Sequence, residues 1–177
     1  MHQLLLNREI YTDFIANRVP KARDHLFVVT ADIKDMYVEA DTGFVPFLEI
    51  LAGLVSAGVL VRLIHAKEPG PRFRQEFDRF PALLESDLFE RILCPRVHTK
   101  AIVIDGALAF VGSANLTGAG MGGKHEDKRN FEAGFMFDDP GEIARLTDWI
   151  DGLYLGECCR TCRRIEHCPD PILDPDQ

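Results

Sequence analysis

The sequence predicts an α/β fold: a mixed, mostly parallel β-sheet flanked by helices, with a short cysteine-rich tail at the C-terminus. The first observation is the alternation of short apolar runs, typical of buried strands, with longer segments whose apolar residues have helical spacing. That order is typical of parallel strands connected by crossover helices. The second is the crowding of four of the five cysteines into residues 158–168. We therefore expect a folded domain over residues 1–155 and a separate tail over 156–177.

The first half of the chain supplies the first helices and strands of this pattern. Mixed apolar and polar positions predict a helix over residues 6–18, and the apolar run 25–30 predicts a central strand. Residues 31–40 fit neither pattern clearly. Asp41–Thr42 resembles a helix N-cap, and the apolar stripe after it predicts a second helix that ends at Gly58.

The following segments continue the alternation. Residues 59–65 predict a strand, and a charged segment near 72–84, after a Pro-Gly-Pro break, predicts a helix. Residues 88–94 form another apolar stretch. Towards the end of the chain, residues 130–137 predict a strand and residues 140–153 predict a helix.

Two apolar runs in the middle of the chain, 101–104 and 107–111, flank a turn signal at Asp105–Gly106 and predict a buried hairpin. His98 and Lys100 stand at the start of its first strand. Because side chains alternate along a strand, both should project to the same side. The carboxylate of the turn lies five residues beyond the lysine, at the far end of the strand. We therefore expect it to hold the turn and not to contact substrate.

Further polar groups gather where the second strand of the hairpin ends. Gly112, Ser113 and Asn115 follow that strand, so a hydroxyl, a carboxamide and accessible backbone donors should lie beside the imidazole and the ammonium. A nucleophile or base, a fixed cation and several donors suit a phosphate ester, because its reaction adds charge to the oxygens around phosphorus. Such chemistry needs no metal ion, so no pattern of metal ligands is required here.

The spacing of these residues, His-x-Lys-x4-Asp-x6-Gly-Ser-x-Asn over residues 98–115, resembles the signature of the phospholipase D superfamily of phosphodiesterases. The resemblance implies that residues 1–155 form a phospholipase D-like catalytic domain. Members of the superfamily resemble one another in having two signature copies, so that two histidines meet at one phosphorus. This sequence has one copy. We therefore expect a twofold homodimer whose interface runs through a shared active site.

The resemblance also implies a role for each residue. His98 of one subunit would attack phosphorus to form a phosphohistidine, while His98 of the other subunit would protonate the leaving oxygen and then activate water. Lys100 and Asn115 would bind the nonbridging oxygens, assisted by Ser113. By its match to an acidic position downstream of the family signature, Glu132 would orient an imidazole nitrogen. The alternative for this residue is an ordinary strand-edge carboxylate. No cofactor is expected for catalysis.

The tail carries the second chemically informative pattern. Cys159, Cys162 and Cys168 are close enough in sequence to supply three thiolates to one tetrahedral metal site. We favour Cys94 as the fourth ligand, because a metal there would pin the tail against the catalytic strand. The alternative fourth ligands are Cys158 and His167. Structural zinc is the first choice for the metal and an iron–sulfur cluster the second, while free buried cysteines are the alternative without metal.

Composition restricts the class of protein. A hydrophobic content of 46% and a charged content of 27% indicate a soluble globular protein. The chain has no run of about 18 apolar residues that could span a bilayer. The apolar run near its start is too short for a signal peptide, because polar residues follow it directly. We therefore expect a cytoplasmic protein. A net charge of −8 argues against a basic, sequence-blind nucleic-acid coat, but it permits a local basic cleft.

Three functions remain open: a nucleic-acid phosphodiesterase, a phospholipid hydrolase or transphosphatidylase, and a non-catalytic binding or sensor protein. The glycine-rich segment 117–123 precedes charged side chains that either are solvated on a surface loop or steer an anionic substrate, namely Lys124, His125, Lys128 and Arg129. The tail adds further cations, Arg160, Arg163 and Arg164. These cations favour nucleic acid as the substrate. Phospholipid is compatible with the acidic charge, but no lipid-binding helix is evident.

Overall fold

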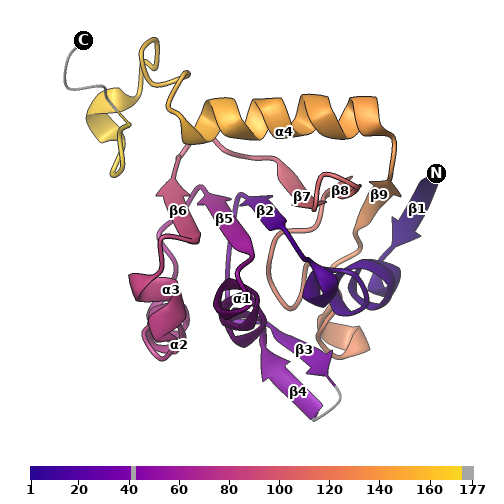
Figure 1. The fold of residues 1–177 in the computed structure, drawn as a ribbon. Coiled ribbons are helices and arrows are strands. Elements are labelled where there is room, and N and C mark those ends of the chain that lie inside the picture. The colour runs from indigo at the N-terminus through magenta and orange to yellow at the C-terminus, as the bar shows by residue number, and fades with distance from the viewer. Residues whose placement is uncertain (41–42, 173–177) are drawn as a thin grey trace.

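The computed structural model describes residues 1–40 and 43–172. A seven-stranded sheet forms the centre of the fold, in the order β1-β9-β8-β7-β2-β5-β6 (Figure 1). A separate two-stranded sheet joins β3 and β4. The strands are β1 (His2–Leu6), β2 (His25–Thr30), β3 (Tyr37–Ala40), β4 (Gly43–Pro46), β5 (Leu60–His65), β6 (Phe89–Leu93), β7 (Lys100–Ile104), β8 (Leu108–Gly112) and β9 (Ala133–Phe137).

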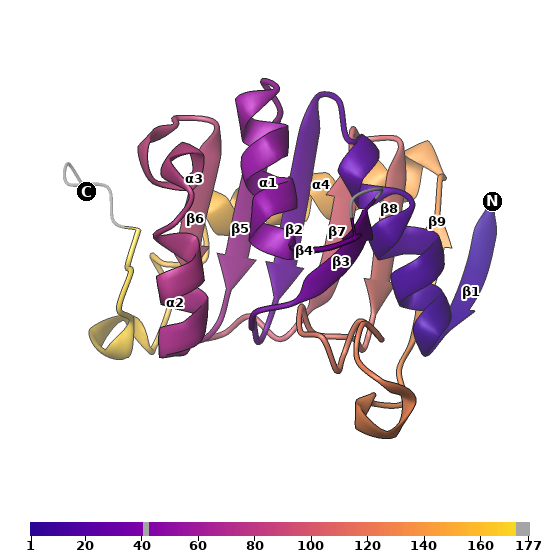
Figure 2. The same cartoon turned by 90° about the horizontal axis from the view of Figure 1, so that it is seen from below.

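Helices cover both faces of the central sheet. They are α1 (Phe47–Ser56), α2 (Pro71–Phe77), α3 (Pro81–Glu85) and α4 (Pro140–Tyr154), with the short helices η1 (Ile10–Ala16), η2 (Val19–Lys21), η3 (Glu126–Lys128) and η4 (Ile165–His167). The long helix α4 runs along one face, whereas η1 and α1 to α3 lie on the other (Figures 1 and 2). No helix in the described ranges is both long and apolar enough to cross a membrane.

Two buried apolar clusters correspond to the two faces of the sheet. On one face, Leu26 of β2 belongs to a cluster with Phe14 of η1 and Leu51 of α1. On the other face, Phe27 of β2 belongs to a cluster with Ile150 of α4. Because side chains alternate along a strand, β2 contributes to both clusters, which agrees with the central, two-sided burial predicted for it.

The predicted mixed α/β sheet flanked by helices is confirmed, but its strands are less often parallel than predicted. The pairs β2–β5 and β5–β6 are parallel. β7 runs antiparallel to β2, and β8, β9 and β1 continue in antiparallel order. The expectation that most strands run parallel is therefore wrong. It was based on the helical crossovers of the first half, whereas the second half contains a hairpin and pairs with a strand from the N-terminus.

The start of the chain also differs from the prediction. Residues 2–6 form the edge strand β1, which pairs with β9, whereas a helix was predicted over residues 6–18. Asn7 ends the strand with a φ of +51°, and the helix that follows is the shorter η1. The leucines at the start of the chain suit a helix as well as a strand, and the strand forms because residues 133–137 pair with it.

Two further helices begin or end differently. The second predicted helix begins at Phe47 after β4, and its predicted cap at Asp41–Thr42 lies outside the described residues. The charged helix predicted near 72–84 is two helices, because Pro81 has no backbone N–H and starts the second one, α3. The other predicted strands and the last helix are present, with ends that differ by a few residues.

Asp105 holds the hairpin turn between β7 and β8, as predicted. Asp105 and Gly106 have φ values of +54° and +60°, as the central residues of a type I′ turn require. The carboxylate also accepts hydrogen bonds of 2.8–3.0 Å from the backbone N–H groups of Arg23, Asp24 and His25. The turn is thereby tied to the start of β2, at the end of the sheet remote from Lys100.

The opposite edge of the sheet collects the residues predicted to be catalytic. Lys100 pairs with Gly112, and Gly112 pairs with Gly134, so these three residues form one row across β7, β8 and β9. β2, β5 and β6 end at the same edge, because they are parallel to one another and antiparallel to β7. Side chains just beyond this row therefore come close together although they are far apart in the sequence.

The contacts of Asp105 predict that Asp105→Asn lowers the free energy of unfolding by about 1.5–3 kcal/mol, the range for hydrogen bonds to a charged group. Asparagine accepts the positive φ of the turn, so the loss reports the carboxylate contacts and not turn strain. Urea denaturation measures it. Asp148→Asn, at an exposed position of α4, is the matched control and should change stability by less than about 0.5 kcal/mol. Equal stability of the two variants would contradict the assignment.

Candidate active site

His98 and Lys100 are in contact at the start of β7. The ammonium of Lys100 donates a hydrogen bond of 2.6 Å to the carbonyl oxygen of His98 and lies 3.3 Å from its Nδ1 atom. The lysine is 7% exposed, whereas the imidazole of His98 is exposed. The predicted pair is thus brought together, with an accessible imidazole above a buried cation.

Two glycines allow β8 and β9 to stay paired up to this edge. A Cβ atom on Gly112 would lie 2.7 Å from the carbonyl oxygen of Ala133, and one on Gly134 would lie 2.5 Å from the ring of Phe110. Neither approach is tolerated by real side chains, so glycine is required at both positions. The backbone N–H of Ser113 donates to the Ala133 carbonyl at 2.9 Å, which continues the pairing beyond β8.

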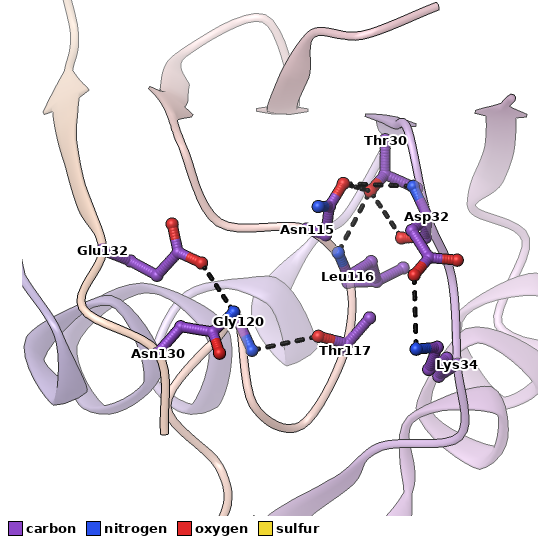
Figure 3. Close-up of polar contacts among 9 residues, drawn as sticks. All are labelled: Thr30, Asp32, Lys34, Asn115, Leu116, Thr117, Gly120, Asn130 and Glu132. Carbon is purple, nitrogen blue, oxygen red and sulfur yellow. Dashed lines mark hydrogen bonds and ion pairs between the residues drawn. The ribbon is translucent and has the colours of Figure 1, made fainter. Parts of the chain in front are cut away.

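Ser113 and Glu132 meet just beyond these glycines. The Ser113 hydroxyl donates to the Glu132 carboxylate and accepts a hydrogen bond of 3.1 Å from the backbone N–H of Ala133. The same carboxylate accepts from the side chain of Asn130 at 3.1 Å (Figure 3). In the described part of the chain no hydrogen bond joins Glu132 to His98. The predicted role of Glu132 in orienting the imidazole therefore stays a prediction, and its observed contacts hold Ser113.

The backbone of Glu132 is fixed by Asn7, which the sequence analysis did not single out. Asn7 accepts a hydrogen bond of 3.0 Å from Glu132 N–H through its side chain and donates one of 2.8 Å to the Glu132 carbonyl through its own N–H. A polar residue directly after a run of three leucines is the signal that the sequence offers. Its pairing partner could not be identified without the β1–β9 register.

The carboxamide of Asn115 has a defined orientation. Its Oδ1 atom accepts from the backbone N–H of Asp32 at 3.0 Å and lies 3.5 Å from the Thr30 hydroxyl (Figure 3). Since the oxygen is held by the Asp32 N–H, the amide nitrogen is directed away from that group, and no hydrogen bond from the nitrogen to a described residue is seen. The group can therefore donate to a bound anionic oxygen, and the predicted role of Asn115 in binding the substrate stays a prediction.

Thr30 connects the two loops at this end of the site. Its hydroxyl donates to the Asp32 carbonyl at 2.8 Å and accepts from the backbone N–H of Leu116 at 3.0 Å. Ile33 and Leu116 also form an isolated parallel bridge. Thr30 is the last residue of β2, and a hydroxyl at the end of an apolar strand was a signal that the sequence analysis did not use.

The glycine-rich segment after Asn115 lies at the same edge of the sheet (Figure 2). Its following residues Lys124, His125 and Lys128 are exposed, and Arg129 is partly buried. Two acidic residues of η3 reduce the local positive charge, and one of them pairs with His125 at 2.6 Å. The segment thus offers accessible lysines near the site and is not uniformly basic.

His65 is buried at the end of β5, two strands from β7 in the sheet. Its ring donates or accepts at both nitrogens: Nδ1 contacts the Lys67 carbonyl and Nε2 contacts the Nε–H of Arg91, each at 2.8 Å. Burial, and then the charge of Arg91, lower the pKa of His65 below its usual value. The imidazole is therefore neutral at neutral pH and acts as a structural acceptor for the guanidinium.

A pocket of about 490 Å³ lies next to His98, between the β6–β7 loop and the tail. Its walls come from the β6–β7 loop, the end of α4 and the tail, and they include all five cysteines: Cys94, Cys158, Cys159, Cys162 and Cys168. None of these cysteines is in a disulfide. The backbone N–H of Arg164, and then the guanidinium of Arg96, hold the pKa of the Cys162 thiol below its usual value.

The predicted metal ligands line this pocket without converging. Within residues 1–40 and 43–172, no three histidine, cysteine, aspartate or glutamate side chains lie close enough together to hold a metal ion. The predicted four-cysteine site is therefore not closed in this structure. What the fold does show is that Cys94 faces the same pocket as the tail cysteines, which their separation in the sequence could not establish.

The fold and its signature have counterparts among known proteins. A family model described as cardiolipin synthase, PLD-like domain, matches residues 16–154, which is most of the chain. The chain belongs to the phospholipase D-like family. Membership supports phosphodiesterase-type activity.

Solved structures resemble the phospholipase D-like chain in fold at low sequence identity. NucT from Helicobacter pylori has a TM-score of 0.63 and 13% identity, over 85% of this chain and 93% of that one. Nuc from Salmonella typhimurium, a phospholipase D family member, has a TM-score of 0.56 and 14% identity, over 85% and 91%. TrmBL2, an archaeal chromatin protein, has a TM-score of 0.58 and 13% identity, over 86% and 51%. No curated protein sequence matches the chain.

The hydrogen bonds of Thr30 predict that Thr30→Val destabilises the phospholipase D-like fold by about 1–3 kcal/mol, because the N–H of Leu116 loses its acceptor. Thr147→Val is the matched control, since the Thr147 hydroxyl is buried without a hydrogen-bond partner among the described residues. The control should be neutral or stabilising. Chemical denaturation compares the two variants, and equal losses would show that the Thr30 contacts do not contribute.

Proposed function

We propose that the protein is a metal-independent phosphodiesterase that hydrolyses nucleic-acid phosphodiesters through a phosphohistidine on His98, at the interface of a homodimer. The observation that carries the proposal is the contact between the exposed His98 imidazole and the buried Lys100 ammonium, within the complete family signature. This pairing provides a nucleophile and a fixed positive charge in one place, as phosphoryl transfer requires.

The groups at the sheet edge suggest how the reaction proceeds. An imidazole nitrogen of His98 forms a bond to phosphorus as the bond to the leaving oxygen breaks, and the protonated His98 of the partner subunit supplies the proton. The partner's His98 then takes a proton from water, whose oxygen displaces the first imidazole. Lys100 and the amide nitrogen of Asn115 bind the nonbridging oxygens throughout, and Ser113, held by Glu132, adds a donor.

A strip of exposed apolar side chains supports the homodimer. Leu4 pairs with Phe135, and Phe135 pairs with Val111, so these side chains form one row across β1, β9 and β8 on the face where α4 lies. Phe135 is 50% exposed, and Phe131, next to Glu132, is 96% exposed. Apolar patches of this kind are typical of protein interfaces. A twofold contact here would place the strip beside the signature residues of both subunits.

Nucleic acid is the favoured substrate because accessible cations lie on two segments next to the signature residues. Lys124 and Lys128 follow directly on the loop that carries Asn115, and Arg96 lines the pocket next to His98. The phosphate backbone is recognised mainly through such charges. The archaeal chromatin protein TrmBL2, which shares the fold, is described as binding DNA. The family model's description, cardiolipin synthase, favours a phospholipid substrate as the second candidate.

One substrate panel separates these functions. Purified protein is incubated with single-stranded DNA, RNA, duplex DNA and phosphatidylcholine vesicles, each with and without brief exposure to EDTA. We expect cleavage of a nucleic acid that persists in EDTA. Cleavage of the lipid alone would select the second candidate. A strict requirement for Mg²⁺ would contradict the mechanism, and binding without turnover on every substrate would indicate a non-catalytic binding or sensor protein.

The mechanism predicts that His98→Asn lowers the hydrolysis rate by about 10³-fold or more, because the nucleophile is lost. Fold and dimer should be retained, since the side chain is exposed and does not pack in the core. His2→Asn, an exposed histidine on β1, is the control and should keep the wild-type rate.

Mixed dimers make this test sharper. If each active site needs His98 from both subunits, the activity of randomly mixed wild-type and His98→Asn subunits falls with the square of the wild-type fraction. A linear decrease would show that one subunit is sufficient and would overturn the shared site.

The apolar strip predicts that Phe135→Glu converts the dimer to a monomer and removes activity, because a charge would be buried in the interface. Sedimentation velocity measures the oligomeric state. Leu84→Glu, at an exposed apolar position of α3 on the opposite face, is the control and should remain dimeric and active. A dimer that persists in Phe135→Glu would place the interface elsewhere.

A further inference from the structure

The tail after α4 has almost no hydrophobic core of its own. Among residues 157–172 none is buried, and the segment is built from turns with the short helix η4. Backbone hydrogen bonds close successive turns at the cysteines: Cys162 N–H donates to the Cys159 carbonyl at 3.1 Å, and Ile165 N–H donates to the Cys162 carbonyl at 3.2 Å. Short segments without a core are usually held by disulfides or a metal ion.

The tail is nevertheless docked at a defined place. A carboxylate oxygen of Asp170 accepts a hydrogen bond of 3.0 Å from the backbone N–H of Leu93, the last residue of β6. Ile172 packs so closely on Gly156 that a Cβ there would lie 2.7 Å from it. The two ends of the tail are therefore drawn together beside Cys94, which directly follows Leu93.

The five cysteines divide into four that are partly buried and one that is exposed. Cys158 is exposed, whereas the partly buried cysteines are Cys94, Cys159, Cys162 and Cys168. All four partly buried thiols line the pocket. Four thiolates complete the tetrahedral coordination of a structural zinc ion, and such a site keeps no open position for catalysis.

The charge around the pocket complements a metal–thiolate centre. Four thiolates around one divalent cation carry a net charge of −2, which is costly to hold in a partly desolvated pocket. Arg96 and Arg164 line the same pocket, where their positive charges would offset that of the centre. Because Arg96 comes from the β6–β7 loop and Arg164 from the tail, both segments contribute to the compensation.

We propose that Cys94, Cys159, Cys162 and Cys168 bind one zinc ion that locks the tail onto the loop leading to His98. The thiols line the pocket without converging, so binding draws the turns of the tail inward towards Cys94. His98 lies on the same pocket wall, four residues after Cys94. The ion thereby stabilises the segment that presents the histidine, and it takes no part in the chemistry.

Metal content tests the site without any measurement of activity, so its outcome is independent of the function proposed above. Protein from zinc-supplemented cells should contain about one zinc per chain by elemental analysis. Cys158→Ser, the matched control, should retain that zinc, whereas Cys94→Ser and Cys162→Ser should lose most of it. Cobalt added to the metal-free wild-type chain should give intense thiolate-to-cobalt absorption, which does not depend on a variant folding.

Several outcomes would overturn the proposal. Zinc-free wild-type protein, a disulfide between any two of the four thiols, or iron with visible absorbance would each exclude the zinc site. Full zinc content in Cys94→Ser would exclude the link between the tail and the His98 loop.

Limited proteolysis tests the locking of the tail. Trypsin should cleave rapidly at Arg160, Arg163 and Arg164 after chelation, and at least about tenfold more slowly once zinc is restored, because local opening precedes cleavage. Cleavage within the main domain, measured in the same digest, is the internal control. Equal cleavage of the tail in both states would overturn the locking.

Discussion

The arrangement of the site depends on the packing of one aromatic ring against two glycines. The ring of Phe110 lies so close to Gly112 and Gly134 that a Cβ on either would approach it within 2.8 Å. β8 and β9 therefore remain paired to their ends only while both positions lack side chains. Ser113 and Glu132 follow directly, so this close approach brings the hydroxyl to the carboxylate. The same ring packs at a tilt against the ring of Phe14 in η1, with 5.3 Å between centroids, which ties the site to the main core.

Sequence analysis could identify the parts of the fold whose partners are close along the chain. The hairpin and its turn at Asp105–Gly106 could be predicted because hydrophobic pattern and turn chemistry agree over a few residues. β1 could not, since the same leucines suit a helix or a strand and the choice depends on pairing with β9. Whether two neighbouring strands run parallel or antiparallel likewise depends on pairing between segments that are far apart in the sequence. The predicted proportion of parallel strands is therefore too high. The break between α2 and α3 has a local cause that the sequence does show, because a proline such as Pro81 starts a helix more readily than it continues one.

The candidate site could also be predicted only in part, because its signature residues have a pattern in the sequence and the residues that orient them do not. His98, Lys100 and Asn115 carry the family signature and stand out by spacing alone. Thr30 and Asn7 orient the site through hydrogen bonds to backbone groups, and backbone partners leave no pattern in the sequence. The signature itself joins two different functions: its lysine lies in the site, while its aspartate secures the opposite end of the sheet. The fold thus depends on a signature residue that lies far from the candidate site.

The pairing of β1 with β9 has a consequence for how the chain is made. The strand β1 finds its partner only when residues 133–137 have been synthesised, so it remains unpaired while the segment between the two strands is made. Its leucines, two of which stay exposed after pairing, are then free to contact other nascent chains. On crowded ribosomes, two copies that emerge close together would present this strand to each other before either sheet is complete. Until β9 has been made, the leucines of β1 are therefore a site for premature contact between chains.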